Sequence, residues 1–587
     1  MKRHLQIVLL VAVLVLLLLL TVRCQPEPEP TPTPTPDVEL TPTPEPFPAP
    51  AEFDAGVLPS GPELPRVQLS PGQSVVEDQL VITGVGTDID RVIGALPELQ
   101  LEPLASTSFD YLEQFRLPPP GGDQEQQQSA GKRRRSGLSS ISRQEMATLR
   151  VDLYAFSDGT PPLSDTLQII ADTVEELGQE QQVRVVAEPN YVVGFEITGD
   201  PWAVEGSPWA VEGSPWAVEG SPADGGPHAS DHFWQQWALD ADQGVGLFAG
   251  DDPSAGNPPA GRTVEDMGEG LRIAVFDTSP FPGPGGYRFD RWGPPSIPSL
   301  ALTVSEPVVL PDSLADEDAT AISDHGLFVS GLAYAVAPAA EIHLVKVLNE
   351  YGQGTLQAFV DALNLYMQEN VDPADGLSNT VINLSLGTSE PDEEELPPEA
   401  RRAIARMMAE WGYRPMAGED SAVFSLEVPM LIAEGLGATV VAASGNDSMS
   451  PPEAAPQLSQ IPAAYPRVLG VEASNRQRSR ACFANDGDLA APGGDGDSSC
   501  APHLDSCEGV DDGNCGAGVV SYVLAEHQGF AYWAGTSFAT PLVSGLAGLV
   551  QEAGPGDPDL VRETVICSAR RTGIVNVVEA LTRCPAP

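Results

Sequence analysis

Residues Tyr532–Val550 read YWAGTSFATPLVSGLAGLV, so that small residues surround one serine and an apolar, helix-like run follows it. Gly535 and Thr536 precede Ser537, and Pro541 comes four residues after it. A serine at the start of a helix is often only a cap, because its hydroxyl accepts a hydrogen bond from an otherwise unpaired backbone N–H group. The same position suits a nucleophile, since those N–H groups can stabilise a developing oxyanion. The rest of the chain decides between these two interpretations.

Apolar strands alternate with helices from about residue 232 onward. Strands are predicted at 271–277, 341–348, 380–387, 438–446 and 467–474, and helices at 355–369, at 422–437 and from Ser537 onward. Continuous apolar strands separated by helices indicate an α/β fold, with a doubly wound parallel sheet covered on both faces. Functional groups of such sheets gather at the carboxyl ends of the strands.

Three polar residues stand at predicted strand ends or helix starts. Asp277 ends the strand LRIAVFD, His325 begins the small-residue helix in SDHGLFVSG, and Asn446 ends VVAASGN. Each alone is typical of a turn, a cap or a structural position. Together with Ser537 they form a complete catalytic set. His325 can act as the base for the serine, and Asp277 can orient the imidazole. The Asn446 side chain and the Ser537 N–H can bind the oxyanion.

These segments resemble the motifs of the subtilases, the subtilisin-like serine proteases. GTSFATP is similar to the family's GTSxAxP, VFDTSP to its Asp motif, DHGLFVSG to its HGTHVAG and AASGN to its oxyanion segment. The order Asp, His, Ser is also that of the family. The His motif departs from the pattern, with Leu327 and Phe328 where the family usually has Thr and a second His. The resemblance implies a subtilisin-like peptidase domain over residues 232–587 that works through an Asp/His/Ser triad and an acyl-enzyme.

The resemblance also implies where a substrate would bind. SLG resembles the strand that pairs with the substrate backbone, and the residues before Asn446 would help to shape the pocket. The substrate-binding residues expected on this basis are Ser385, Leu386, Gly387, Ser444 and Gly445. They are small or apolar, which predicts a roomy pocket that tolerates large apolar side chains.

The amino-terminal region predicts export. In residues 1–23, Lys2 and Arg3 precede an apolar run over residues 5–22, which is typical of a signal peptide and is also barely long enough for a membrane anchor. A lipidated Cys24 is a third interpretation. All three place the rest of the chain outside the cytoplasm, with the membrane as a partner only through this segment. The Pro/Thr/Glu-rich residues 24–65 predict an extended linker.

Residues 66–198 predict a small α+β domain. Strands are expected at 79–84, 148–156 and 182–195, and helices at 88–96 and 163–177. A polar loop interrupts them, and its basic cluster Lys132–Arg135 is either solvated or a processing site. The position of this domain and its closing VVAEPNYVV resemble subtilase propeptides. The resemblance implies a folding chaperone and temporary inhibitor, removed by cleavage within residues 199–231.

Residues 199–231 contain a tandem repeat, in which PWAVEGS occurs three times over Pro201–Ser221. Proline and glycine in every copy exclude a helix and predict a flexible linker.

Charge and cysteine content restrict the partners and the compartment. A formal charge of −53 argues against nucleic-acid binding, which requires a basic face. Six cysteines between residues 482 and 584 predict disulfides in an exported chain, with Cys567–Cys584 as one pair. A zinc site at Cys500, Cys507 and Cys515 is a rival, although it lacks a CxxC pair. The acidic insert that holds these three residues predicts either a solvated loop or a structural calcium site. The proposed chemistry requires no cofactor.

Two classes of function remain open at this stage. The first is an exported serine endopeptidase, made as a zymogen, that acts on polypeptides and is inhibited by its own propeptide. The second is a catalytically silent subtilase fold that serves as a surface binding module. A transpeptidase or dedicated processing protease is a variant of the first.

Overall fold

The computed structural model describes the following parts of the chain: residues 51–53, 67–69, 74–114, 146–157, 159–179, 181–194, 233–234, 236–240, 243–245, 263–289, 297–313, 322–388, 395–413, 423–448, 455–494, 518–524, 530–554 and 556–584. All of them belong to one compact unit, Ala49–Pro587. The predictions for residues 1–23, Lys132–Arg135, the PWAVEGS repeat and the cysteines of the acidic insert lie outside the described residues. Among the described helices, none is both long enough and apolar enough to cross a membrane.

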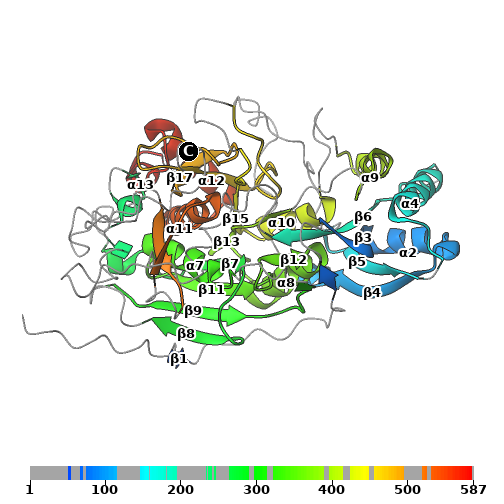
Figure 1. Ribbon diagram of the computed structural model, residues 1–587, viewed down its shortest axis with the longest axis horizontal. Helices are drawn as coiled ribbons and strands as arrows, with labels where there is room; N and C mark the ends of the chain where they lie inside the picture. Colours follow the sequence, from blue (N-terminus) through cyan, green and yellow to red (C-terminus); the bar gives the residue numbers. More distant parts are fainter. Residues whose placement is uncertain are drawn as a thin grey trace, which may run out of the picture. The chain divides into compact units, whose positions relative to one another are not determined.

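A nine-stranded sheet forms the centre of the larger part (Figure 1). Its strands, in spatial order, are β1 (Ala51–Phe53), β8 (Gly285–Phe289), β9 (Leu300–Ser305), β11 (Glu341–Lys346), β7 (Arg272–Asp277), β13 (Thr380–Leu384), β15 (Thr439–Ala443), β16 (Leu469–Ser474) and β17 (Leu489–Pro492). Neighbours from β9 to β17 are parallel, whereas β8 pairs antiparallel with both β1 and β9. The predicted parallel sheet is therefore confirmed.

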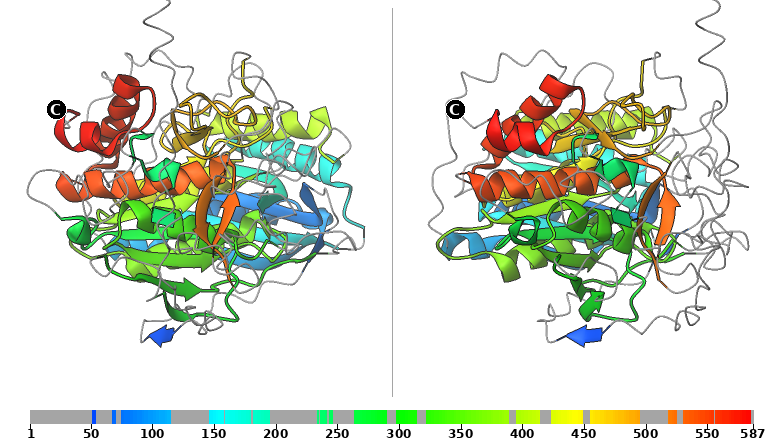
Figure 2. Two further views of the ribbon diagram at one scale, coloured as in Figure 1. Left: turned by 60° about the vertical axis from the view of Figure 1, so that its left-hand side comes forward. Right: turned by 90° about the vertical axis from the view of Figure 1, so that its left-hand side faces the viewer.

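Alternate residues of the central strands face two different hydrophobic cores. In β7, Ile273 and Val275 belong to the core that contains α7 (His325–Val336) and α11 (Thr536–Ala553). Ala274 and Phe276 belong to the other core, with α8 (Leu356–Asn370) and α10 (Phe424–Gly435). Because strand side chains alternate between faces, an unbroken apolar strand requires a cover on both sides. In both views of Figure 2 the long helix α11, in orange, runs alongside the sheet.

A second, antiparallel sheet lies in residues 75–194 and continues into the larger part. Its strands, in order, are β12 (Gln353–Thr355), β6 (Val185–Gly194), β3 (Val75–Val85), β5 (Leu149–Phe156) and β4 (Leu101–Ser108), and β14 (Gly387–Thr388) also pairs with β6. The helices α2 (Gly86–Gly94) and α4 (Leu163–Gly178) pack on it. The α+β character predicted for this segment is present. The strand β4 was not predicted, since its residues are mostly exposed or half-buried and carry no clear alternation.

Two side chains of β6 cap helices of the larger part. The Glu188 carboxylate accepts hydrogen bonds from the backbone N–H groups of Phe424, at 3.1 Å, and Ser425, at 2.6 Å, where α10 begins. Asn190 Oδ1 accepts a hydrogen bond from the N–H of Gln357 at 3.1 Å, in the first turn of α8. Acceptors at helix starts satisfy orphan N–H groups and interact favourably with the helix dipole. Strand β6 is thus fixed to both helices that cover this face of the main sheet.

The remaining described strands and α-helices are β2 (Gln68–Leu69), β10 (Asp312–Ser313), β18 (Val519–Tyr522), β19 (Phe530–Trp533), α9 (Pro398–Glu410), α12 (Pro558–Thr572) and α13 (Val577–Thr582). The predicted Cys567–Cys584 disulfide is confirmed and joins α12 to the residue that closely follows α13. Cys482 is disulfide-bonded as well. One part of the predicted linker differs from expectation, because Ala51–Phe53 pairs with β8 as an edge strand instead of remaining a spacer.

Candidate active site

Asp277 and His325 form a buried pair. Asp277 is the last residue of β7 and His325 the first residue of α7. His325 Nδ1 lies 2.8 Å from Asp277 Oδ1 and 3.0 Å from Oδ2, and both side chains are at most 2% exposed. The N–H of Thr278 donates to Asp277 Oδ1 at 2.7 Å and fixes the carboxylate. A carboxylate on Nδ1 holds the imidazole so that Nε2 is the nitrogen that can exchange a proton with a nucleophile.

Close packing around Gly326 sets the geometry of this pair. A β-carbon at this position would lie 2.2 Å from the carbonyl oxygen of Thr278 and 3.0 Å from Cβ of Asp277. Only glycine therefore lets the first turn of α7 approach the end of β7 so closely.

Ser537 lies in the first turn of α11, buried to 5% exposure. Its hydroxyl donates to the carbonyl oxygen of Ser385 at 3.3 Å, and no hydrogen bond joins it to His325 among those of the described residues. In the other direction, the Ser385 hydroxyl donates to the carbonyl oxygen of Ser537 at 2.8 Å. The next residue, Phe538, brings α11 against the base, with its ring centroid 5.2 Å from that of His325. Rotation about the Cα–Cβ bond is the movement that would redirect the Ser537 hydroxyl.

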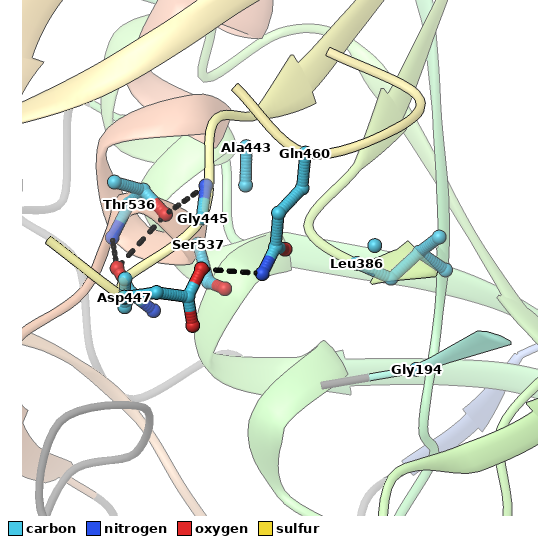
Figure 3. Close-up of a pocket in the computed structure, with 10 residues that line it drawn as sticks. Gly194, Leu386, Ala443, Gly445, Asp447, Gln460, Thr536 and Ser537 are labelled. Carbon is cyan, nitrogen blue, oxygen red and sulfur yellow. Dashed lines mark hydrogen bonds between the residues drawn. The ribbon is translucent and has the colours of Figure 1, made fainter. Parts of the chain in front are cut away.

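Asn446 follows β15 and is held by the residue that precedes Ser537. Its Oδ1 accepts hydrogen bonds from the N–H of Thr536, at 2.9 Å, and from the Thr536 hydroxyl, at 3.0 Å. The Thr536 hydroxyl also accepts the N–H of Gly445 at 3.3 Å (Figure 3). Because these hydrogen bonds fix Oδ1 as an acceptor, the Nδ2 group of Asn446 is the part of the amide that can donate. An amide donor in this position can stabilise an oxyanion that forms beside Ser537.

A pocket adjoins Ser537 (Figure 3). The residues that line it are Gly194, Leu386, Gly387, Ala443, Gly445, Asn446, Asp447, Gln460, Thr536 and Ser537. Three of the five predicted substrate-binding residues, Leu386, Gly387 and Gly445, are among them. Ser385 and Ser444 are not, and the Ser444 hydroxyl donates instead to the carbonyl oxygen of Asn485 at 3.0 Å.

Gln460 and Asp447 are pocket residues that the sequence analysis missed. Gly194 of β6 also lines the pocket, so the observed space is that of the uncleaved chain. The tolerance for large apolar side chains stays a prediction. Asp447 directly follows Asn446 in sequence, and this neighbourhood is a signal that could have found it; Gln460 carries no such signal.

No group of three or more His, Cys, Asp or Glu side chains able to hold a metal ion occurs within the described parts of the chain.

Comparison with known proteins finds similarity to subtilisin-like serine proteases. The subtilase family profile matches residues 308–580. A thermophilic serine proteinase from Bacillus sp. strain AK1 is 27% identical over 252 residues, which are 41% of this chain and 45% of that protein. Subtilisin BL from Lederbergia lenta is 25% identical over 311 residues, which are 51% of this chain and 82% of that protein. The chain thus spans less than half the length of the first relative.

Solved structures are more distantly similar. A protease from Pseudoalteromonas arctica aligns with 60% of this chain and 98% of its own length, at 23% identity and a TM-score of 0.39. The family profile carries more weight, since the residues that it matches include His325, Asn446 and Ser537. This chain is therefore similar to the subtilases, the subtilisin-like serine proteases, over the residues that the family profile matches, which are less than half of its length.

Proposed function

We propose that this chain is an exported serine endopeptidase that is made as a zymogen. The observation that carries the proposal is the buried Asp277–His325 pair at the end of β7, with Phe538, the neighbour of Ser537 in sequence, packed against the imidazole. Ser537 attacks the peptide carbonyl after its hydroxyl turns from Ser385 towards His325, which accepts the proton. Asp277 orients the imidazole and stabilises it once it is charged.

The oxyanion of the tetrahedral intermediate would lie between two donors. The backbone N–H of Ser537 is one and Asn446 Nδ2 is the other. His325 then returns the proton to the leaving amine, which leaves an acyl group on Ser537. Water hydrolyses this ester by the same path in reverse. The substrate backbone pairs with the edge that Gly387–Thr388 offers, in the manner of β-augmentation.

The experiment is labelling of the purified chain with a fluorophosphonate probe, together with hydrolysis of an unstructured protein substrate. Labelling of the native chain that disappears in Ser537→Ala and falls strongly in His325→Ala supports the peptidase. A chain that hydrolyses nothing and labels at the background rate of Ser537→Ala supports the silent binding module. An added amine nucleophile that yields ligated products instead of hydrolysis identifies a transpeptidase.

We propose that residues 66–198 act as the inhibitor. The support is the pairing of β6 with both β12 and β14, which sets Gly194 at the wall of the pocket beside Ser537. A chain that enters the site in this way occupies the place of a substrate strand. Cleavage downstream of Gly194 would free the site once the segment dissociates. N-terminal sequencing of the mature protein tests this, and a mature chain that begins before residue 190 contradicts it.

Export is the part of the proposal that concerns location. The Cys567–Cys584 disulfide supports an oxidising compartment outside the cytoplasm. Mass spectrometry of the native protein, recovered separately from the culture medium and from membranes, would locate the protein and identify its first residue. Recovery from the cytoplasm alone would contradict export.

A further inference from the structure

The side chain of Gln460 crosses the pocket beside Ser537. Figure 3 shows it directed from its own loop into the space between the segment of Gly445 and that of Leu386. A β-carbon at Gly445 would lie 2.7 Å from Cδ of Gln460, and one at Gly387 would lie 2.6 Å from Oε1. The amide therefore lies against both walls of the pocket.

Hydrogen bonds hold Gln460 in this place. Its Nε2 donates to Asp447 Oδ2 at 2.6 Å, and its backbone N–H donates to the carbonyl oxygen of Ser444 at 2.9 Å. Asp447 is itself fixed, since Oδ2 also accepts from Asn485 Nδ2 at 2.9 Å and its backbone N–H donates to Asn485 Oδ1 at 3.1 Å. Asn485 is 1% exposed. Because a buried amide anchors the carboxylate, and the carboxylate in turn anchors the glutamine, moving Gln460 breaks a charge-assisted hydrogen bond.

The reaction geometry determines which substrate residue meets Gln460. A peptide paired with Gly387–Thr388 in the manner of β6 would bring its reacting carbonyl to Ser537. The side chain of the residue that carries this carbonyl would then meet the adjoining pocket, which holds Gln460 and Asp447. The residue on the acyl side of the scissile bond is therefore the one that the pocket selects.

We propose that Gln460, fixed by Asp447, restricts this residue to glycine, alanine or serine. The inference rests on the proposed peptidase function and names its substrate class. A leucine or phenylalanine side chain must displace the glutamine and leave the half-buried Asp447 carboxylate with one donor fewer. A lysine or arginine side chain must compete for a carboxylate oxygen that two amides already occupy. By either route we expect kcat/KM about 30-fold or more below that for alanine.

The test uses the full chain, matured and titrated with a fluorophosphonate probe so that active sites are counted. Peptides that differ only in the residue before the scissile bond (Gly, Ala, Ser, Leu, Phe, Lys or Glu) are compared for the native enzyme, Gln460→Gly and Gln460→Ala. We expect the phenylalanine-to-alanine ratio of kcat/KM to rise at least about 30-fold in Gln460→Gly and less in Gln460→Ala. Leu458→Ala is the control, because Leu458 is an exposed residue of the same loop that does not line the pocket. It should leave the ratio unchanged.

Several outcomes overturn the inference. One is a native enzyme that cleaves after phenylalanine or lysine as well as after alanine, and this result requires no variant to fold. Another is a Gln460→Gly enzyme that still labels at Ser537 and keeps the native ratio. These failures leave the peptidase proposal intact. If the native chain neither labels nor hydrolyses any peptide, the peptidase proposal itself fails, and the substrate class fails with it.

Discussion

Gly194, the last residue of β6, pairs in antiparallel register with Gly387 of β14, and both line the pocket that contains Ser537. Gly194 also pairs with Gln353 of β12. The chain at this point is therefore a strand between two strands, which is the position that a substrate backbone would take. The same contact thus joins the proposed inhibitor to the proposed site of cleavage.

Replacing Gly194 by alanine should slow the cleavage that the chain performs on itself. A β-carbon here would lie 2.0 Å from the carbonyl oxygen of Gly352, which is backbone and cannot rotate away. The strand must shift, and a shift of about 1 Å at a reacting group can cost 100-fold in rate. We expect the cleaved fraction of Gly194→Ala to accumulate at least about tenfold more slowly on a denaturing gel. Gly94→Ala is the control, since no atom lies within 4 Å of its added carbon. Equal rates for the two variants would contradict the prediction.

Replacing Asp277 by asparagine should leave the fold intact and remove most of the activity. One oxygen of Asp277 accepts the Thr278 N–H at 2.7 Å, which favours the amide oxygen at that place and turns the NH₂ group towards His325. This NH₂ group, in the place of Oδ2 at 3.0 Å from His325 Nδ1, favours the tautomer in which Nδ1 accepts and Nε2 carries the proton, and in that tautomer the base is lost. For a serine protease this tautomer costs roughly 10⁴-fold in kcat. Peptide hydrolysis measures the loss, and an unchanged melting temperature shows that the fold survives. Activity within tenfold of the native enzyme would contradict the assignment of Asp277.

Buried carboxyl groups predict that docking of β6 and β4 on α8 and α10 depends on pH. Burial raises the pKa of Asp361 on α8 to about 7, although the hydrogen bond from Gln357 opposes the shift. The Asp361 carboxylate also accepts the hydroxyl of Thr107 from β4. Burial likewise raises the pKa of Glu188 to about 7, against the hydrogen bonds from Ser425 and Phe424. A raised pKa means that each of these carboxyl groups keeps its proton in the docked state at a pH where the same group, exposed to water, has lost it. The contribution of each protonated carboxyl group to the stability of the docked state is present at about pH 4 and is lost as pH rises through about 7.

This dependence can be measured on the uncleaved Ser537→Ala chain. We expect its melting temperature to fall from pH 5 to pH 8, and adding Asp361→Asn should reduce the fall, because the amide keeps its shape and cannot ionise. Glu369→Gln is the matched control, since Glu369 is exposed on the same helix. A fall of the same size in all three proteins would show that Asp361 does not report docking. The high net negative charge of the chain acts equally on all of them.

The central strands and the catalytic candidates could be predicted because their signals are local. Ile273–Phe276 is an apolar run that ends in Asp277, and Ser537 stands in a motif of a few residues, so neither requires knowledge of distant contacts. The place of Gln460 in the pocket could not be predicted. Gln460 lies 14 residues after Asn446 in sequence, and tertiary contacts, among them its hydrogen bonds to Asp447 and Ser444, bring its side chain back across the pocket. The pairing of β6 with β12 and β14 is hidden for the same reason, because strand pairing depends on tertiary contacts and β-propensity does not record the partner.

Replacing Gly326 by alanine should lower both the free energy of unfolding and kcat, because the close approach of α7 to β7 at this residue also sets the contact between His325 and Asp277. The added carbon would lie 2.2 Å from the Thr278 carbonyl oxygen and 2.9 Å from Cδ1 of Leu344, in a region with no room for it. Relief requires α7 to move away from β7, at a cost typical of overpacking, about 1–3 kcal/mol in the free energy of unfolding. The same movement lengthens the 2.8 Å contact between His325 Nδ1 and Asp277 Oδ1, so kcat should fall while KM changes little.

Denaturant unfolding measures the loss of stability of the Gly326→Ala variant, and peptide kinetics measure its loss of activity. Gly178→Ala, at the end of α4 where the added carbon meets nothing within 4 Å, should change neither. A Gly326→Ala enzyme with native kcat would mean that the Asp277–His325 contact tolerates the movement and does not limit the rate.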